Sequence, residues 1–155
     1  MTELREAFER DPAHVVETYR GMVRSVIETA DLDRRHFLWG ELRLREAQVL
    51  MDAVPALKSR YEADLLRLMA KLHLRQQKPE RGLPEMEAAM EAALRYDDFR
   101  TGGLIMEELA ETALEHGEAV RAIQCNHLAL QNFTLAGDET GATRCQERAA
   151  RIQAG

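Results

Sequence analysis

The chain has 155 residues and a formal net charge of −6, with 45% hydrophobic and 31% charged residues. This length and balance suit one globular domain that buries a core without a disulfide or metal staple, and they exclude a wholly disordered chain. No apolar run approaches the roughly 18 residues of a transmembrane helix, and the charged N-terminus lacks the apolar segment of a secretory signal. Only Cys125 and Cys145 are present, too few for a disulfide framework, so we expect a reduced cytoplasmic protein with no membrane contact.

The charge is unevenly distributed along the chain. Residues 1–82 carry 15 basic and 14 acidic side chains, whereas residues 83–155 carry 6 and 13. Binding to the phosphate backbone depends on Lys and Arg, so the acidic second half disfavours it. We therefore expect no nucleic-acid partner.

Helix-forming residues dominate throughout, and no segment alternates like a strand. The first predicted helix begins at Pro12, after Asp11 as a capping residue, and ends near Asp31–Asp33. Its apolar stripe recurs at helical spacing. The stripe consists of Val15, Val16, Tyr19, Met22, Val23, Val26 and Ile27.

The second predicted helix alternates large and small residues, and a neighbouring backbone is expected to approach closely at Gly40 and Ala47. Pro55 ends this helix and opens the third. The apolar positions expected in the second helix are Phe37, Gly40, Leu44, Ala47, Met51 and Val54, and those in the third are Leu57, Tyr61, Leu65, Leu68, Met69 and Leu72.

Four more helices are expected in the second half. Residues 78–82 (Lys-Pro-Glu-Arg-Gly) predict a loop, and the fourth helix follows Pro84. Asp97 and Asp98 cap the fifth helix, which Gly117 ends. The sixth helix runs to Gly137, with Val120, Ile123, Leu128 and Leu130 as its apolar positions, and Asp138 caps the last. The sequence thus predicts an all-α fold of about seven helices, antiparallel because the loops are short.

Alternate helices begin near Pro12, Pro55, Asp97 and Asp138, at intervals of 43, 42 and 41 residues. Regular spacing in this range indicates stacked helical hairpins, with a plain helix bundle as the alternative. We expect one domain over residues 1–155, with hairpins at about 12–54, 55–96 and 97–136 and a capping helix at 138–153.

Residues 104–136 resemble a tetratricopeptide repeat hairpin. Four positions fit the pattern and three depart from it. The positions that fit are Leu109, Gly117, Ala122 and Ala129. Ala110 stands where the family has Gly, and Ala113 stands where it has Tyr. Asn126 stands where the family has an aromatic residue.

The resemblance covers about a fifth of the chain well, and the period near 42 exceeds the roughly 34 residues of the standard repeat. With this longer period, the chain is similar to the long-helix variants of the repeat that occur in bacterial regulators and sensors. The resemblance implies a right-handed solenoid that serves as an adaptor or binding module, without catalysis.

No catalytic, cofactor or metal constellation is evident. The five histidines form no metal-binding motif, and Cys125 and His127, two positions apart on a helix, point about 200° away from each other. We therefore predict a non-enzymatic protein with no metal and no cofactor, in which His127 is a core or boundary residue.

Two candidate binding features remain. Trp39 is the last residue of a basic and aromatic segment, residues 34–39, that is expected to be a solvated helix start, and it is a candidate anchor for a partner. Glu107, Glu111 and Glu115 recur every four residues and form an acidic stripe on the fifth helix. In the family this helix lines the concave groove, which implies a basic peptide ligand. The alternative is pairing with the basic side of the third helix, formed by Arg60, Arg67, Lys71 and Arg75.

Two classes of function stay open. The first is a protein- or peptide-binding or self-assembling adaptor, and the second is a regulatory domain that senses a small molecule between its hairpins. Homo-oligomerisation is expected because the first helix leaves an apolar flank without a polar cap. The last helix is expected to serve as the polar cap through Arg144, Glu147, Arg148 and Arg151.

Overall fold

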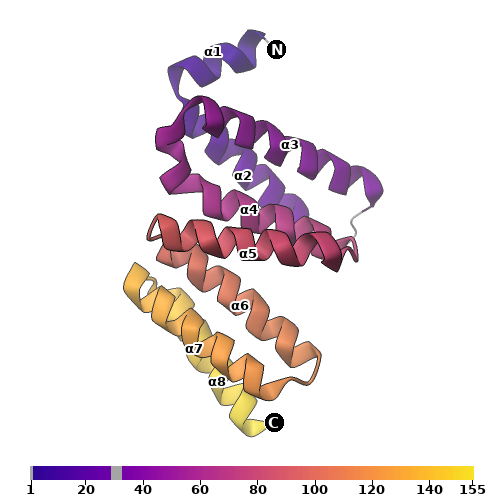
Figure 1. The fold of residues 1–155 in the computed structure, drawn as a ribbon, viewed down its shortest axis with the longest axis vertical. Helices are drawn as coiled ribbons and strands as arrows, with labels where there is room; N and C mark the ends of the chain where they lie inside the picture. Colours follow the sequence, from indigo (N-terminus) through magenta and orange to yellow (C-terminus); the bar gives the residue numbers. More distant parts are fainter. Residues whose placement is uncertain (1, 29–32) are drawn as a thin grey trace. The chain divides into compact units, whose positions relative to one another are not determined.

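The structure is a computed structural model that describes residues 2–28 and 33–155, and every regular element in these ranges is a helix (Figure 1). The all-α prediction is confirmed. The chain forms two compact units, Met1–Ala92 and Ala93–Gly155. The elements are α1 (Thr2–Arg10), α2 (Pro12–Glu28), α3 (Arg34–Ala53), the 3-10 helix η1 (Pro55–Leu57), α4 (Lys58–Arg75), α5 (Pro79–Arg95), α6 (Phe99–Glu115), α7 (Ala119–Ala136) and α8 (Glu139–Ala154).

The described ranges hold eight α-helices, where the sequence predicted about seven. The additional helix, α1, precedes the first predicted helix. Its Phe8 packs against the buried cluster to which Val15 and Val16 belong. Part of the apolar flank expected to lie uncovered at the first predicted helix is therefore covered by α1.

Three aspartates begin helices as predicted. Asp11, Asp98 and Asp138 each accept a hydrogen bond from the backbone N–H three residues further on, at 3.1, 3.2 and 3.0 Å. Each carboxylate thereby satisfies an N–H that the first turn of a helix leaves without an intrahelical acceptor. The predicted helix starts at Pro12, after Asp97–Asp98 and after Asp138 are confirmed to within two residues.

The boundaries around α3 differ slightly from the prediction. Of the predicted break at Asp31–Asp33, residues 31 and 32 lie outside the described residues, while Asp33 caps α3 by accepting from the backbone N–H groups of Arg35 and His36. Pro55 ends α3 as expected. It opens one 3-10 turn, and α4 itself begins at Lys58.

The predicted loop at residues 78–82 is wrong, because α5 begins at Pro79. Proline lacks a backbone N–H and suits the first position of a helix, where that group would have no partner. Gly82 then lies against α4: a Cβ there would meet Leu74 Cγ at 2.6 Å and the backbone oxygen of Ala70 at 3.1 Å. Gly82 therefore serves close packing of α5 on α4. Pro84, expected before the fourth helix, lies inside α5.

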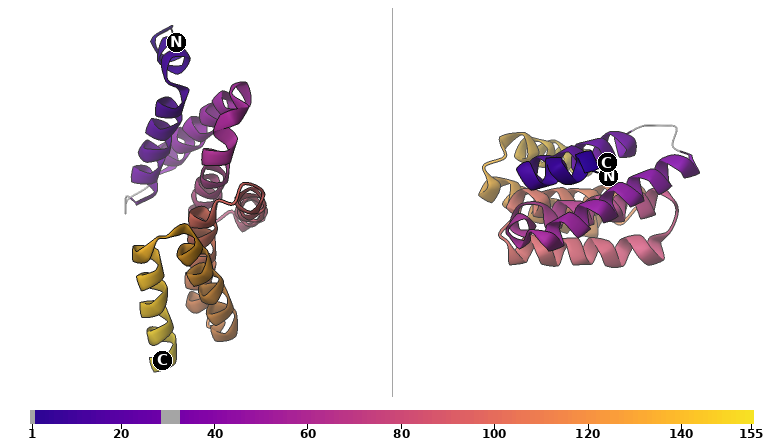
Figure 2. Two further views of the ribbon diagram at one scale, coloured as in Figure 1. Left: turned by 90° about the vertical axis from the view of Figure 1, so that its left-hand side faces the viewer. Right: turned by 90° about the horizontal axis from the view of Figure 1, so that it is seen from above.

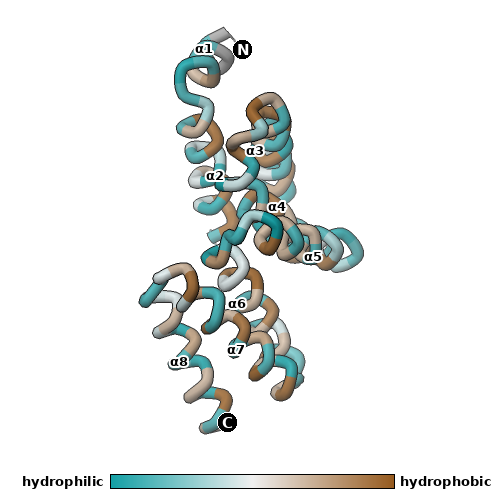
Figure 3. The backbone as a smooth tube through the Cα atoms, turned by 60° about the vertical axis from the view of Figure 1, so that its left-hand side comes forward, coloured by the Kyte–Doolittle hydropathy of each residue, from teal (hydrophilic) through white to brown (hydrophobic). Residues whose placement is uncertain are grey.

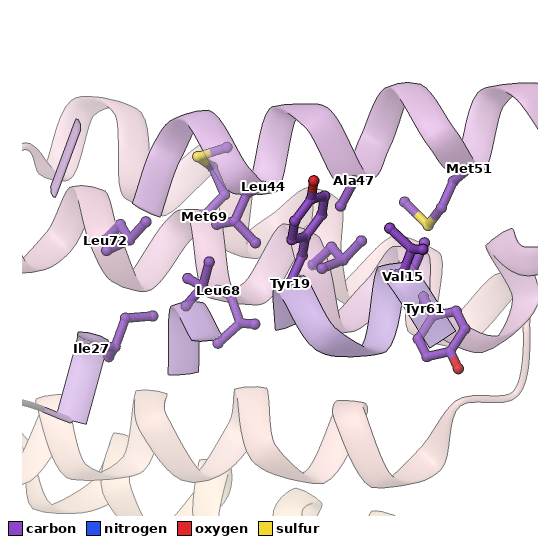
Figure 4. Packing of buried hydrophobic residues seen from close by; sticks show 13 residues of the cluster. Val15, Tyr19, Ile27, Leu44, Ala47, Met51, Tyr61, Leu68, Met69 and Leu72 are labelled. Atoms are coloured by element: carbon purple, nitrogen blue, oxygen red, sulfur yellow. The ribbon is translucent and has the colours of Figure 1, made fainter. Parts of the chain in front are cut away.

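The core of the unit Met1–Ala92 lies between α2, α3 and α4 (Figure 4). Gly40 is buried, and a Cβ there would lie 3.1 Å from Leu72 Cδ1, so the Leu72 side chain, rather than the backbone that we expected, packs closely against Gly40. Met22, assigned to the apolar stripe of α2, is exposed. The buried apolar side chains are Val15, Val16, Tyr19, Val23, Ile27, Leu44, Ala47, Met51, Tyr61, Leu65, Leu68, Met69 and Leu72.

The same unit buries a carboxylate among arginines. Asp64 and Arg67 on α4 are both buried and lie 2.8 Å apart, and Arg20 and Arg24 of α2 each reach Asp64 Oδ2 at 3.4 Å. Burial raises the pKa of Asp64, but the surrounding arginines, Arg67 first, bring it below its ordinary value. The cluster links α2 to α4 through charge.

The unit Ala93–Gly155 packs α6, α7 and α8 around Phe133, and α8 lies beside α7 (Figures 1 and 2). Phe133 and Cys145 are fully buried. The glycines Gly103 of α6 and Gly141 of α8 both face the Phe133 ring at distances that leave no room for a Cβ. This finding gives a packing reason for the two glycines that follow the capping aspartates.

The prediction for α7 identified the wrong face. Val120, Ile123 and Leu128, expected in the core, are exposed, and Leu130 is half-buried. The buried face instead consists of Ala122, Asn126, Ala129 and Phe133. Apolar residues lie on both sides of this helix, so their periodicity alone did not identify the buried side. Figure 3 shows hydrophobic and hydrophilic residues alternating along the helices of the chain.

Candidate functional site

The acidic stripe on α6 faces arginines of α8. Arg144 Nη2 lies 3.0 Å from Glu107 Oε1, and Arg148 Nη2 lies 2.8 Å from Glu107 Oε2. Arg148 Nε and Arg151 Nη2 both reach Glu111 Oε1, at 2.7 and 3.1 Å. Two carboxylates and three guanidinium groups thus form one network within the unit Ala93–Gly155.

Arg148 is the buried centre of this network. Its Nη1 donates to Asn126 Oδ1 at 2.9 Å, and the Asn126 amide donates to the backbone oxygen of Cys145 at 2.9 Å. Burial lowers the pKa of Arg148, but the hydrogen bonds that it donates to Glu111 and Glu107 raise it above its ordinary value. Asn126, which stands where the tetratricopeptide pattern has an aromatic residue, therefore joins α7 to α8 by hydrogen bonds.

These contacts give the three glutamates different surroundings. The side chain of Glu107 is largely buried, and the hydrogen bond from Arg148 holds the pKa of Glu111 below its ordinary value. Glu115 is exposed at the last position of α6. The structure does not bring the three carboxylates together as one solvent-facing stripe.

The basic residues proposed as partners of the stripe have contacts in their own unit. Arg67 pairs with Asp64, and Arg60 lies 3.7 Å from Glu17. Arg75 donates to the backbone oxygen of Ile27. The arginines of α8, which the sequence analysis assigned to a polar cap, are the observed partners of Glu107 and Glu111.

Trp39 lies half-buried on α3. The guanidinium carbon of Arg43 lies over the Trp39 ring, at 5.8 Å from the ring centre. Together with Val26, Arg35 and His36 it lines a depression of about 440 Å³. Four lining residues form an open surface, whereas ligand pockets enclose most of a small molecule. Trp39 is thus accessible as a contact residue.

A second hollow lies between α7 and α8 and has a volume of about 230 Å³. Apolar carbon forms most of its surface, because Ile123 and Leu130 of α7 face Ala149 and Ile152 of α8. Cys145 and Asn126 are buried beside it. The full lining is Ile123, Asn126, His127, Leu130, Cys145, Gln146, Ala149, Ile152 and Gln153. We call this hollow the α7–α8 groove.

Two histidines differ from the sequence-based interpretation. His127, predicted as a core or boundary residue, is exposed and lies 3.2 Å from the Gln131 amide nitrogen. His73, to which no role was assigned, is buried, with Nδ1 2.5 Å from Glu85 Oε2 and Nε2 3.6 Å from Glu41 Oε1. His73 therefore links α4 to α3 and α5.

Both cysteines are free thiols. Cys145 is a buried free thiol whose pKa is raised, chiefly by burial, and Cys125 is a partly buried free thiol. Across residues 2–28 and 33–155, no three His, Cys, Asp or Glu side chains are arranged to hold a metal ion. Within the same ranges, no helix combines the length and apolar character needed to span a bilayer.

No protein-family model matches the chain, and no curated protein matches it. Among solved structures, the chain is similar to the crystal structure of BtubC (BKLC) from P. vanneervenii, with a TM-score of 0.51 and 16% sequence identity. The similarity covers 99% of this chain and 86% of that chain. At 16% identity, the similarity supports a shared helical fold and gives no information about activity.

Proposed function

We propose that the chain is a non-enzymatic protein-binding adaptor with a tetratricopeptide-like arrangement of hairpins. The observation that carries this proposal is the α7–α8 groove, which an apolar side chain of a partner helix or peptide would fill. Ile123, Leu130 and Ile152 form apolar walls beside the buried Cys145. Burying an apolar side chain in such a groove is favourable because it removes carbon surface from water.

The groove is a better candidate than the acidic stripe for the principal contact. Glu107 and Glu111 are already bonded to Arg144, Arg148 and Arg151. A basic peptide would have to displace these arginines, and the buried Arg148 would then lose its carboxylate partners. Among the three glutamates, the exposed Glu115 is the one at which a basic residue of a partner would find an accessible carboxylate.

The volume of the groove favours a protein partner over a small molecule. Pockets that hold small molecules are typically about 300–1,000 Å³ and enclose most of the ligand. The groove measures about 230 Å³, which suits one or two apolar side chains. The larger depression at Trp39 has four lining residues and does not enclose a ligand.

The test compares two alanine-to-phenylalanine variants. Ala149→Phe fills the groove, whereas Ala150→Phe adds the same ring at an exposed position outside it. Each purified protein is immobilised and exposed to extract from the native cell, and captured proteins are quantified by mass spectrometry. We expect a partner that wild type and Ala150→Phe retain and that Ala149→Phe loses, with equal melting temperatures. Identical capture by all three proteins would contradict the proposal.

A further inference from the structure

The face of α7 that points away from the core has an unusual composition. Six of its residues are exposed and lie within an arc of about 100° on the helix. Val120 is 71% exposed, Leu135 66% and Leu128 43%. The six residues are Val120, Gln124, His127, Leu128, Gln131 and Leu135, and we call them the outer face of α7. It lies opposite the buried positions Ala122, Asn126, Ala129 and Phe133.

The outer face carries no acidic or permanently charged side chain. Arg121 is the one Asp, Glu, Lys or Arg among the 18 residues of α7, and it lies beside this face, whereas 31% of the whole chain is charged. Because the chain has a net charge of −6, two copies repel each other over most contacts. Contact through the outer face of α7 brings no carboxylate against another carboxylate. Because it lacks carboxylates, the outer face of α7 is suited to contact with a second copy of this acidic chain.

The spacing of the outer face is also symmetric. Its six positions are separated by four, three, one, three and four residues, so the pattern reads the same in both directions. In an antiparallel pair related by a two-fold axis between residues 127 and 128, Val120 of one copy lies opposite Leu135 of the other. Gln124 then lies opposite Gln131, where two amides are able to exchange hydrogen bonds.

We propose that the outer face of α7 is a two-fold, antiparallel interface with a second copy of this chain. Apolar side chains meet at both ends of the contact, through two Val120–Leu135 pairs, and Leu128 lies near the axis.

This interface differs from the α7–α8 groove, although His127 borders both surfaces. Val120 and Leu135 do not line the groove, and Ala149 is not part of the outer face. Failure of one proposal is therefore distinguishable from failure of the other. A variant at Val120 is expected to lose the dimer and keep the groove partner, whereas Ala149→Phe is expected to do the reverse.

Sedimentation equilibrium of the full chain, up to a few hundred micromolar, tests the interface. Wild type is expected to form a dimer, and Val120→Glu to weaken it at least about 100-fold, because each copy then places a carboxylate against an apolar side chain. Val49→Glu is the matched control, since Val49 on α3 is 67% exposed and lies outside α7. A monomeric wild type, a dimeric Val120→Glu, or equal loss in Val49→Glu would overturn the proposal.

A mixing experiment tests the orientation of the two copies. Val120→Lys and Leu135→Glu are each expected to be monomeric alone. When they are mixed, the antiparallel pair brings Lys at position 120 of one chain to Glu at position 135 of the other, and leaves one native Val120–Leu135 pair. A heterodimer in the mixture supports the antiparallel arrangement, whereas no association in the mixture contradicts it. Circular dichroism confirms that each variant keeps its helices.

Discussion

Gly141 on α8 lies directly against the ring of Phe133 on α7: a Cβ at Gly141 would be 2.5 Å from Cδ1 and 2.6 Å from Cγ of that ring. Gly103 on α6 approaches the same ring, where a Cβ would lie 2.7 Å from Cδ1. The ring is fully buried and has no exposed side toward which to move. Backbones of two helices therefore close on one aromatic side chain, and this contact fixes the spacing within the unit Ala93–Gly155.

Gly141→Ala is expected to lower the free energy of unfolding by about 1–3 kcal/mol, because the added methyl group overpacks a core that has no space for it. Urea denaturation followed by circular dichroism measures the change. Gly21→Ala is the matched control: Gly21 lies within α2, and beyond the adjoining helix backbone and its two chain neighbours nothing lies within 4 Å of the added Cβ. That variant is expected to gain about 0.5–1 kcal/mol from helix propensity. Equal effects at the two positions would contradict the packing argument.

Glu107→Gln is expected to lower the free energy of unfolding by about 2 kcal/mol, because the buried Arg148 loses a charged hydrogen-bond acceptor. Glu115→Gln, at the exposed end of α6, is expected to change it by less than about 0.5 kcal/mol. Thermal denaturation of both variants at the same pH checks the difference. If Glu107→Gln leaves the melting temperature unchanged, the ion pairs with α8 contribute nothing to stability.

Asp64 is expected to make stability depend on pH. Its pKa is lower in the folded chain than its ordinary value, so its contribution is present above about pH 4 and is lost as the pH falls through the lowered pKa. Asp64→Asn is expected to be less stable than wild type by about 3 kcal/mol near neutral pH, because the buried Arg67 loses its ion pair with the Asp64 carboxylate. The difference is expected to shrink as the pH falls below about 4 and through the lowered pKa of Asp64, where wild type loses the same charge.

Denaturant titrations over that pH range measure this narrowing. Asp52→Asn is the control, because Asp52 is exposed and its ion pair with Lys58 lies at the surface. The control is expected to stay within about 0.5 kcal/mol of wild type near neutral pH. A difference in the free energy of unfolding between wild type and Asp64→Asn that stays constant at all pH values would contradict the prediction. It would show that the charge of Asp64 does not contribute to stability through the surrounding arginines.

Gly82→Ala is expected to destabilise the chain by about 1–3 kcal/mol, because the new Cβ would meet the backbone oxygen of Ala70 as well as the Leu74 side chain. Backbone oxygen in a helix cannot move without distorting the helix. Urea denaturation measures the effect, and the exposed Gly21 again provides the comparison. A Gly82→Ala variant as stable as wild type would mean that α5 shifts freely along α4.

Gly82 also shows where sequence reasoning reached its limit. The Pro-Glu-Arg-Gly segment has the composition of a loop, yet Pro79 suits the first turn of a helix and Gly82 suits close packing, and composition does not distinguish these cases. Helix starts with an aspartate cap were predictable because the cap is a local interaction. The choice between the two faces of α7 was not, because it depends on contacts with Gly103 and Gly141 from other helices.

The candidate site was predicted in part. The sequence indicated that Glu107 and Glu111 share one side of α6, and the structure places them there. Their partners were missed, although Arg144, Arg148 and Arg151 follow the same helical spacing on α8 and have the opposite charge. That matching periodicity was the available signal. The α7–α8 groove has no comparable signal, because it arises from the approach of two helices.

The position of Trp39 determines what a fluorescence measurement reports. It is the one tryptophan of the chain and lies in the unit Met1–Ala92, partly buried beside Arg43. Its emission therefore follows the unfolding of that unit, whereas the helix signal in circular dichroism averages over all eight α-helices of the described ranges. If the Trp39 fluorescence transition occurs at a lower or higher denaturant concentration than the circular dichroism transition, the unit Ala93–Gly155 unfolds in a transition of its own. A coincident pair of curves would show that a single cooperative transition carries both signals.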